Sequence, residues 1–308
     1  MNSAMIDRLV NSLLYEGYIL YPYRASSLKN RMRFNFGVLY PRVYAEEQKG
    51  ADAWTMRTEC LAQADSNATV KICVRFLRIA ERPGAQQWQE AKECRIDLAT
   101  PTAGALLRTP IKHEFVLPAE TDVSEGIERS SEAIQGVIGV SAEPACDGII
   151  RLSVQIVNLT GINKGASRNH ALARSLVSAH TVFGIKGGEF VSLLQPPPEF
   201  ASVAATCRNE GSWPVLVGDA GARDCMLASP IILYDYPSVA PESPGDLFDA
   251  LEIDEILTLR VLTMTDSEKE EARLIDQRAR RILERAECLP PEAFSKLHGA
   301  FRGGRSQP

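Results

Sequence analysis

Apolar residues near the N-terminus follow the spacing of an amphipathic helix. We expect this helix to begin after Ser3, which is a favourable N-cap, and to end at Gly17, which suits the position just beyond a helix. The apolar positions that recur on one face are Ile6, Leu9, Val10, Leu13 and Leu14.

Next along the chain, the pattern changes to the alternation that is typical of strands. Val70–Leu77 alternates and is rich in β-branched residues, and Ala91–Leu98 follows it. Together they predict an antiparallel hairpin with a long connection. Val137–Val140 and Ile149–Val157 predict a second pair of strands, because Asp147-Gly148 between them supplies turn chemistry.

The rest of the central region predicts one helix and several short strands. One strand is expected at His113–Leu117, and the helix is expected from about Arg168 to Ser178. Glycines in Gly184–Gly188 and Gly218–Gly221 match no phosphate-binding loop, so we expect them in hairpin turns, where a positive φ is tolerated. Further short strands are expected near Thr181, Phe190, Val215 and Ile231.

Helical spacing returns in the C-terminal part of the chain. Pro244 after Ser243 suits the first turn of a helix, and Thr265 with Glu268 matches a capping box. Because strands connected in hairpins favour an antiparallel sheet, the predicted fold class is α+β. We expect a mainly antiparallel β core, of which a sandwich is one form, an N-terminal helix and a C-terminal helical unit.

The predicted domain boundaries follow these changes in pattern. Residues 1–45 hold the N-terminal helix and a segment rich in tyrosine and arginine, and residues 46–240 form the β-rich core. Residues 241–302 form the helical unit, and residues 303–308 are predicted to be a disordered tail.

The composition is that of a folded chain without a broad basic face. Of the 308 residues, 45% are hydrophobic and 24% are charged, close to the average of globular domains. The net charge of −5 disfavours a nucleic-acid partner. No apolar run reaches the roughly 20 residues that a membrane span needs, so we expect no membrane association. The seven cysteines form no CxxC pair and no disulfide framework, which favours a reducing compartment, the cytoplasm.

No motif in the sequence predicts catalysis, a metal site or another cofactor. The four histidines show neither HxxxH nor HExxH spacing, and none is spaced with cysteine as in a zinc site. A cysteine–histidine nucleophilic pair remains open, with His180 and either Cys207 or Cys225 as candidates. The sequence therefore favours a protein that is not an enzyme over an enzyme, without deciding between them, and we expect no cofactor.

A segment rich in tyrosine and basic residues is the strongest candidate for contact with another molecule. Six of the eight tyrosines lie between Tyr15 and Tyr44, and the other two flank Asp235. Tyrosine clusters suit protein interfaces, whereas aromatic and basic residues together also suit single-stranded nucleic acid or a phosphate ligand. A third interpretation is that the tyrosines pack on the sheet while the arginines pair with acids. The candidate partner-binding residues are Tyr21, Tyr23, Arg24, Lys29, Arg31, Arg33, Tyr234, Asp235 and Tyr236.

Several short strings near the two ends of the chain carry a family resemblance. They are Leu13–Tyr18, Leu20–Arg24, Lys29–Arg31, Phe36-Gly37, Ser229–Pro237, Pro241–Ser243, Gly245–Asp249 and Glu252–Leu257. In these strings the chain resembles accessory proteins encoded beside nickel-iron uptake hydrogenases in soil and other aerobic bacteria. The match covers the β-rich middle poorly and carries no catalytic residue. The chain also lacks the CxxC pair and the histidine-rich tract with which maturation factors handle nickel or iron.

Two functions follow from these observations. The resemblance implies a non-enzymatic accessory or assembly factor that acts through protein–protein contacts, with a hydrogenase subunit or a maturation factor as its partner. The alternative is an enzyme of unrecognised type, with a pocket lined by the Tyr/Arg-rich segment. In the first case we expect the stretches 18–44 and 234–237 to form one continuous surface.

Overall fold

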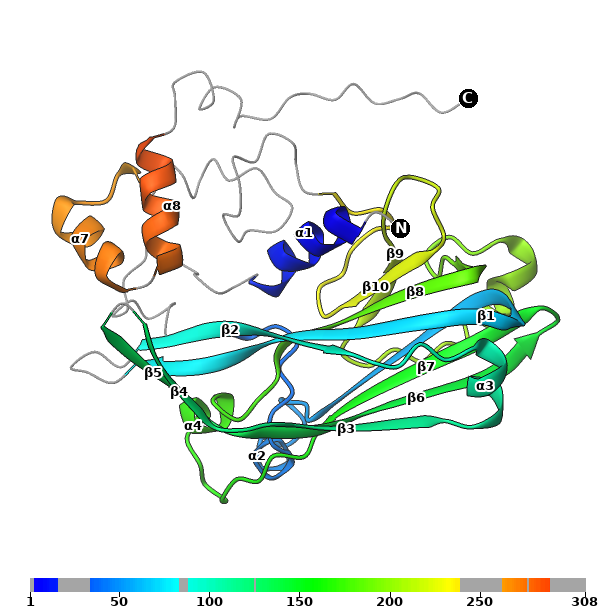
Figure 1. The fold of residues 1–308 in the computed structure, drawn as a ribbon, viewed down its shortest axis with the longest axis horizontal. Helices are drawn as coiled ribbons and strands as arrows, with labels where there is room; N and C mark the ends of the chain where they lie inside the picture. Colours follow the sequence, from blue (N-terminus) through cyan, green and yellow to red (C-terminus); the bar gives the residue numbers. More distant parts are fainter. Residues whose placement is uncertain are drawn as a thin grey trace. The chain divides into compact units, whose positions relative to one another are not determined.

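The chain folds as an α+β protein around a mainly antiparallel β core, as the sequence predicts (Figure 1). The computed structural model describes residues 3–15, 34–82, 88–124, 126–238, 262–275 and 277–288. Residues 3–14 belong to one compact unit with the described residues from 34 to 237, and residues 262–275 and 277–288 belong to a second. In the described part of the chain, no helix is long and apolar enough to cross a membrane.

The elements follow one another in a fixed order along the chain. The helices are α1 (Ser3–Leu14), α2 (Arg42–Glu47), α3 (Ala103–Arg108), α4 (Arg168–Leu172), the 3-10 turn η2 (Pro198–Phe200), α5 (Ala201–Ala204), α7 (Asp266–Ile275) and α8 (Gln277–Glu287). The strands are β1 (Thr55–Arg82), β2 (Trp88–Asp97), β3 (Ile111–Leu117), β4 (Glu120–Ser124), β5 (Ile127–Ser131), β6 (Ile134–Cys146), β7 (Ile149–Asn158), β8 (Val177–Val191), β9 (Trp213–Leu216) and β10 (Cys225–Ser229).

Strand β1 organises the sheet because it is long enough to pair with different strands along its length. Its first half pairs with β7, its second half pairs with β2, and β8 follows its other side. The main path through the sheet is β3-β6-β7-β1-β8-β10-β9, with the β4–β5 hairpin attached to β1 through β5. The register of β1 against β8 shifts between Ala64 and Thr69, where the Asp65 carboxylate accepts from the backbone N–H groups of Asn67 and Ala68.

The core lies between two halves of this sheet. Side chains alternate along β1, so that Ile72, Val74 and Phe76 all point into the same buried cluster. The Phe76 ring lies 6.2 Å from the ring of Phe115 on β3. Because β6 and β7 separate β3 from β1 in the strand order, this contact requires the sheet to fold over on itself, as in a sandwich.

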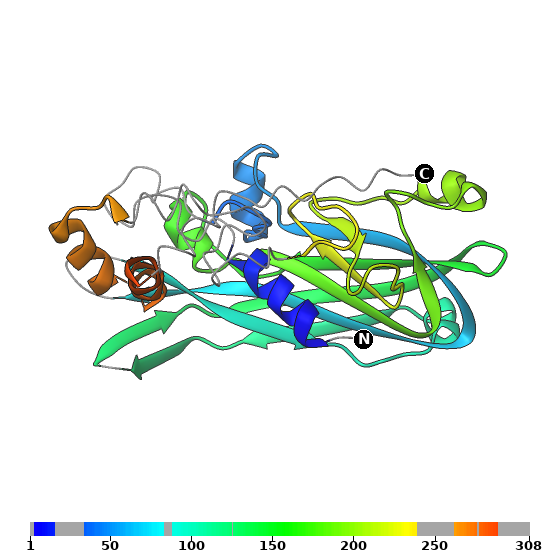
Figure 2. The same cartoon turned by 90° about the horizontal axis from the view of Figure 1, so that it is seen from above.

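Helix α1 covers the opposite face of β1 and β8 (Figure 2). Its apolar stripe is the predicted one, because Ile6, Leu9, Val10, Leu13 and Leu14 are all buried. On the same face of β1 lies Arg75, one position before the core residue Phe76. The alternation of β1 therefore sends one set of side chains into the core and the other toward α1.

Both predicted hairpins are confirmed, whereas three other predictions for this region are wrong. β1 pairs with β2, β6 pairs with β7, and Gly148 in the second turn has a φ of 70°. However, the helix predicted over residues 168–178 ends at Leu172, and Val177 already belongs to β8. The short strands predicted near residues 181 and 190 are one continuous strand, and residue 231 lies beyond the end of β10.

The glycines of Gly184–Gly188 lie within β8 rather than in the predicted hairpin turn. They face the register shift of β1, and a Cβ at Gly188 would lie 2.7 Å from the carbonyl oxygen of Gln63. Their small size therefore permits the close approach of two strands at a bend. The second glycine pair is predicted correctly, because Gly218 and Gly221 lie in the turn between β9 and β10 with φ values of 114° and 87°.

The second unit contains the helices α7 and α8. The predicted capping box is present, since Thr265 N–H donates to Glu268 at 2.6 Å and Glu268 N–H donates to the Thr265 hydroxyl at 3.4 Å. Glu287 at the end of α8 pairs with Lys269 and Arg273 of α7, at 3.3 and 2.8 Å. The helix predicted from Ser243 lies outside the described residues, as does the predicted tail.

Candidate functional site

The structure describes three of the nine predicted partner-binding residues. These are Tyr234, Asp235 and Tyr236, which lie between β10 and the end of the first unit. The other six lie outside the described residues: Tyr21, Tyr23, Arg24, Lys29, Arg31 and Arg33. The candidate site is therefore built from the segment 231–237 and its neighbours.

Segment 231–237 runs along the edge strand β9. Ser229 at the end of β10 is opposite Trp213 at the start of β9. The chain then returns along β9, and Tyr236 N–H donates to the carbonyl oxygen of Leu216 at 2.7 Å. An edge strand with free backbone groups invites unwanted strand pairing, and this segment occupies those groups at the end of β9.

Asp235 fixes this segment to the sheet. Its two carboxylate oxygens accept hydrogen bonds from the Ser192 hydroxyl at 2.5 Å and from Leu216 N–H at 2.8 Å. Tyr236 is half-buried against the main core and adopts a φ of 58°, which is unusual for a residue other than glycine. Asp235 and Tyr236 therefore hold the loop in place rather than present themselves to a partner.

Tyr234 and Ile232 point the other way. Tyr234 is 88% exposed and Ile232 is 73% exposed, whereas Leu233 between them is buried. Trp213, which is also exposed, lies opposite Ser229 at the start of the same segment. We call Trp213, Ile232 and Tyr234 the Tyr234 surface. Ile232 and Tyr234 extend from a loop that Asp235 holds on the sheet, and exposed aromatic and aliphatic side chains on such a loop suit a protein-binding surface.

The described end of the Tyr/Arg-rich segment reaches the base of this loop. Gly37 packs so closely on Pro230 that a Cβ at Gly37 would lie 2.5 Å from Pro230 Cγ. Ala179 N–H also donates to the carbonyl oxygen of Gly37, at 3.0 Å. Residue 37 of the first predicted stretch therefore lies beside Pro230, which precedes the second stretch, and the continuous surface over 18–44 and 234–237 stays a prediction. Phe36, beside Gly37, is exposed.

The three tyrosines of the segment that the structure describes, Tyr15, Tyr40 and Tyr44, are buried and not surface residues. Tyr40 and Tyr44 are buried with their ring centroids 5.0 Å apart. Burial raises the pKa of Tyr40 to about 12, although Arg168 acts in the opposite direction. For these two residues, packing against the protein explains the aromatic composition, and the interface interpretation is wrong.

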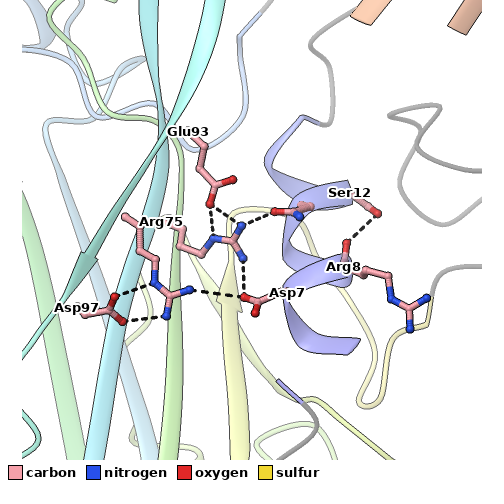
Figure 3. A network of polar contacts seen from close by, with 8 residues as sticks. Asp7, Arg8, Ser12, Arg75, Glu93 and Asp97 are labelled. Carbon is pink, nitrogen blue, oxygen red and sulfur yellow. Dashed lines mark hydrogen bonds and ion pairs between the residues drawn. The ribbon is translucent and has the colours of Figure 1, made fainter. Parts of the chain in front are cut away.

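A second cluster of polar residues lies on the sheet beneath α1 (Figure 3). Arg95 of β2 is opposite Arg75 of β1, and Arg75 is in turn opposite His180 of β8. His180 continues the row to Ser229 of β10 through a side-chain hydrogen bond of 3.2 Å. Such a row of basic and nucleophilic residue types resembles a catalytic or anion-binding site, so the contacts of each member decide its role.

The arginines of this row hold α1 on the sheet. Arg75 is 4% exposed, and its guanidinium donates to Glu93 at 2.7 Å, to Asp7 of α1 at 3.2 Å and to Asn11 of α1. Asp7 also lies 3.7 Å from Arg95, which pairs with Asp97 at 2.7 Å. Like charges directly opposite on neighbouring strands are destabilising, so Asp7 offsets the repulsion between the two arginines.

A small cavity of about 30 Å³ lies beside these contacts. Its lining includes Asp7, Lys71, Cys73 and the two arginines. The volume suits one or two water molecules rather than an organic ligand. Burial raises the pKa of the Cys73 thiol to about 12, so this cysteine stays protonated and unreactive at neutral pH.

His180 and Ser229 form a hydrogen-bonded pair with no access to solvent. His180 Nδ1 lies 2.7 Å from the carbonyl oxygen of Ser178, which can only accept, so Nδ1 carries the proton. Nε2 therefore accepts from the Ser229 hydroxyl, in the arrangement that activates a nucleophile. However, both residues are 0% exposed, and burial lowers the pKa of His180 to about 4. The pair cannot meet a substrate in this structure.

The sequence left open a pairing of His180 with Cys207 or Cys225, but the described hydrogen bonds of the His180 ring join it to Ser178 and Ser229. Burial raises the pKa of Cys225 to about 11. Cys207 is half-buried beside Arg151, and burial raises its pKa despite the guanidinium. Neither thiol has the lowered pKa of a reactive cysteine.

Comparisons with known proteins identify no relative from which a function could be inferred. No protein-family model matches the chain, and no curated protein matches it. Within the described ranges, no three of the His, Cys, Asp and Glu side chains come together as metal ligands would. Of the two clusters, the Tyr234 surface is the one whose side chains remain available to another molecule.

Proposed function

We propose that the protein is a non-enzymatic binding protein and that the Tyr234 surface contacts its protein partner. The observation that carries this proposal is the exposure of Tyr234, at 88%, on a loop whose neighbouring residue Asp235 is bound to the sheet through both carboxylate oxygens. A large aromatic side chain presented in this way is available for burial in a partner's pocket.

The fixed backbone of the loop favours binding. Association costs free energy when a loop or a side chain must be ordered at the interface. The hydrogen bonds of Asp235 and of Tyr236 N–H hold the loop before any partner arrives. Tyrosine and tryptophan also contribute large contact areas with few rotatable bonds, and for this reason they dominate binding energy at many interfaces.

The proposed partner is a hydrogenase subunit or a maturation factor, and the proposed role is in assembly of a nickel-iron hydrogenase. Support comes from the resemblance described above, since the string Ser229–Pro237 contains both Ile232 and Tyr234. The part of the chain that carries the resemblance is therefore also the part that presents apolar side chains to solvent.

We favour this role over an enzyme because the enzyme-like pair is enclosed. His180 and Ser229 are fully buried, and the nearby arginines are engaged with Asp7, Glu93 and Asp97. The binding role uses exposed residues and needs no opening of the sheet.

An affinity pull-down from hydrogenase-expressing cells tests the proposal. The wild-type protein should retain a hydrogenase subunit or a maturation factor, identified by mass spectrometry, and the double variant Ile232→Ser/Tyr234→Ala should lose it. Val123→Ser is the matched control, because Val123 is a similarly exposed apolar residue on β4. If the double variant and the wild type retained the partner equally, the proposed surface would be contradicted. If the wild type retained neither a hydrogenase subunit nor a maturation factor, the proposed partner would be contradicted.

A further inference from the structure

The two ends of the main strand path, β9 and β3, differ in whether another segment covers them. At one edge, the segment 231–237 lies along β9 and bonds to Leu216. At the other edge, β3 pairs with β6 alone among the strands that the structure describes. Figure 1 shows β3 along the rim of the sheet opposite to β9. An edge strand of seven residues therefore offers its second row of backbone groups for pairing.

Side chains on the outer face of β3 extend into solvent. Lys112, Glu114 and Val116 are exposed, and Val116 reaches 68%. The alternate residues point inward, where Phe115 joins the core. Within one chain, Lys112 and Glu114 pair with each other at 2.5 Å in an exposed position, where such a contact contributes little to stability.

The sequence of β3 is complementary to itself in one antiparallel register. With a two-fold axis at His113, Lys112 lies opposite the partner's Glu114, and Ile111 lies opposite the partner's Phe115. A shift of the axis by one residue, to Lys112 or Glu114, instead places that residue opposite its own copy, which is a pairing of like charges. If one β3 strand slid along the other by an odd number of residues, inward side chains of one copy would lie opposite outward side chains of the other.

We propose that β3 pairs with β3 of a second copy in the antiparallel register centred on His113, so that two sheets continue through a two-fold axis. The two Lys112–Glu114 pairs then form between copies instead of within each chain. Because each copy contributes one short strand, the contact area is small and the dimer exchanges rapidly with monomer. The Tyr234 surface lies at the other edge of the sheet and stays free, so this inference is independent of the proposed function.

Sedimentation velocity over a range of concentrations tests the dimer, with charge-swapped variants as the decisive reagents. K112E places a carboxylate opposite the partner's Glu114, and E114K places an ammonium opposite the partner's Lys112. Each variant alone should weaken dimerisation by about tenfold or more. An equimolar mixture of the two should dimerise again, because each carboxylate then faces an ammonium across the axis.

Both substituted side chains are exposed, so the variants should melt at the temperature of the wild type, and a thermal melt provides that control. Three outcomes would overturn the proposal. They are a wild-type protein that stays monomeric up to about 100 µM, a dimer that both variants leave intact, and a mixture of the variants that stays monomeric. The first of these would leave β3 open to an extended peptide from a different protein.

Discussion

The sheet face beneath α1 and the loop 231–237 hold side chains of the kinds found at functional sites, but they use them in opposite ways. Beneath α1, Arg75 and His180 are almost fully buried and form hydrogen bonds with residues of the same chain. On the loop, Asp235 makes such internal contacts while Tyr234 next to it is left to solvent. The contrast teaches that residue type alone does not identify a binding residue. Side chains that are buried and hydrogen-bonded within the chain are structural, whereas exposed side chains are candidates for binding.

Arg75 should give the largest effect on stability. Replacing it with alanine removes the hydrogen bonds of the buried guanidinium to Glu93 and Asp7, and a hydrogen bond to a charged group contributes about 1.5–3 kcal/mol. Arg95→Ala is the control, since Arg95 is half-exposed and should cost less. Urea unfolding measures both values. A loss below about 1 kcal/mol for Arg75→Ala would show that α1 does not depend on this contact.

The pH dependence of stability should report on His180. Its pKa is about 4 in the folded protein and near 6.5 when unfolded, so the folded state favours the neutral ring. The resulting stability is complete above the unfolded pKa and is lost as the pH falls from 6.5 toward 4. Linkage gives a loss of about 2 kcal/mol between about pH 7.5 and pH 5.

His180→Asn removes this titration and is the matched comparison. The difference between the wild-type and variant free energies of unfolding should shrink by that amount as the pH falls, because the variant has no imidazole to protonate. Arg75, across the strand pair, adds to the penalty for a charged imidazole. Parallel profiles for the two proteins would mean that His180 does not stay neutral in the fold.

Asp235 should show a smaller effect that links stability to binding. Asp235→Ala leaves Ser192 and Leu216 N–H without their acceptor, at a cost of about 1–3 kcal/mol. It should also weaken partner binding without touching the partner, because the loop loses its anchor. Asp122→Ala, at an exposed position of β4, is the control for removal of a carboxylate. If the Asp235→Ala protein were less stable but bound the partner normally, the hydrogen bonds of Asp235 would not be needed for binding.

The sequence predicted elements whose signals are local. The β6–β7 hairpin has alternating strands and the turn residues Asp147-Gly148, and the capping box of α7 lies within four residues. The continuous β8 could not be predicted, because the glycines of Gly184–Gly188 have the composition of a turn and are explained only by the bend of β1 opposite them. The end of α4 was missed because Leu172, Ala173, Leu176 and Val177 keep the helical spacing of apolar residues into β8.

The candidate site was predicted only in outline, for a similar reason. Tyr234, Asp235 and Tyr236 form one motif in the sequence, but their roles depend on Leu216 and Ser192, which are distant in the chain. Likewise, the opposition of Arg75 and Arg95 follows from the register of β1 against β2, and Asp7 meets them only when α1 packs on the sheet. Composition therefore predicted which region is a candidate for binding, whereas the role of each residue in it depends on contacts with distant parts of the chain.

Tyr234 should give the smallest effect on stability and the largest on binding, and its substitution is therefore the most direct test of the proposed function. Tyr234→Ala should change the free energy of unfolding by less than about 0.5 kcal/mol, because the side chain is 88% exposed. Its affinity for the partner proposed above should fall at least about tenfold, as for an aromatic residue at the centre of an interface. Tyr234→Phe, which keeps the ring, should bind nearly as well as the wild type. Unchanged affinity of Tyr234→Ala, or a loss of binding matched by a loss of stability, would contradict the account.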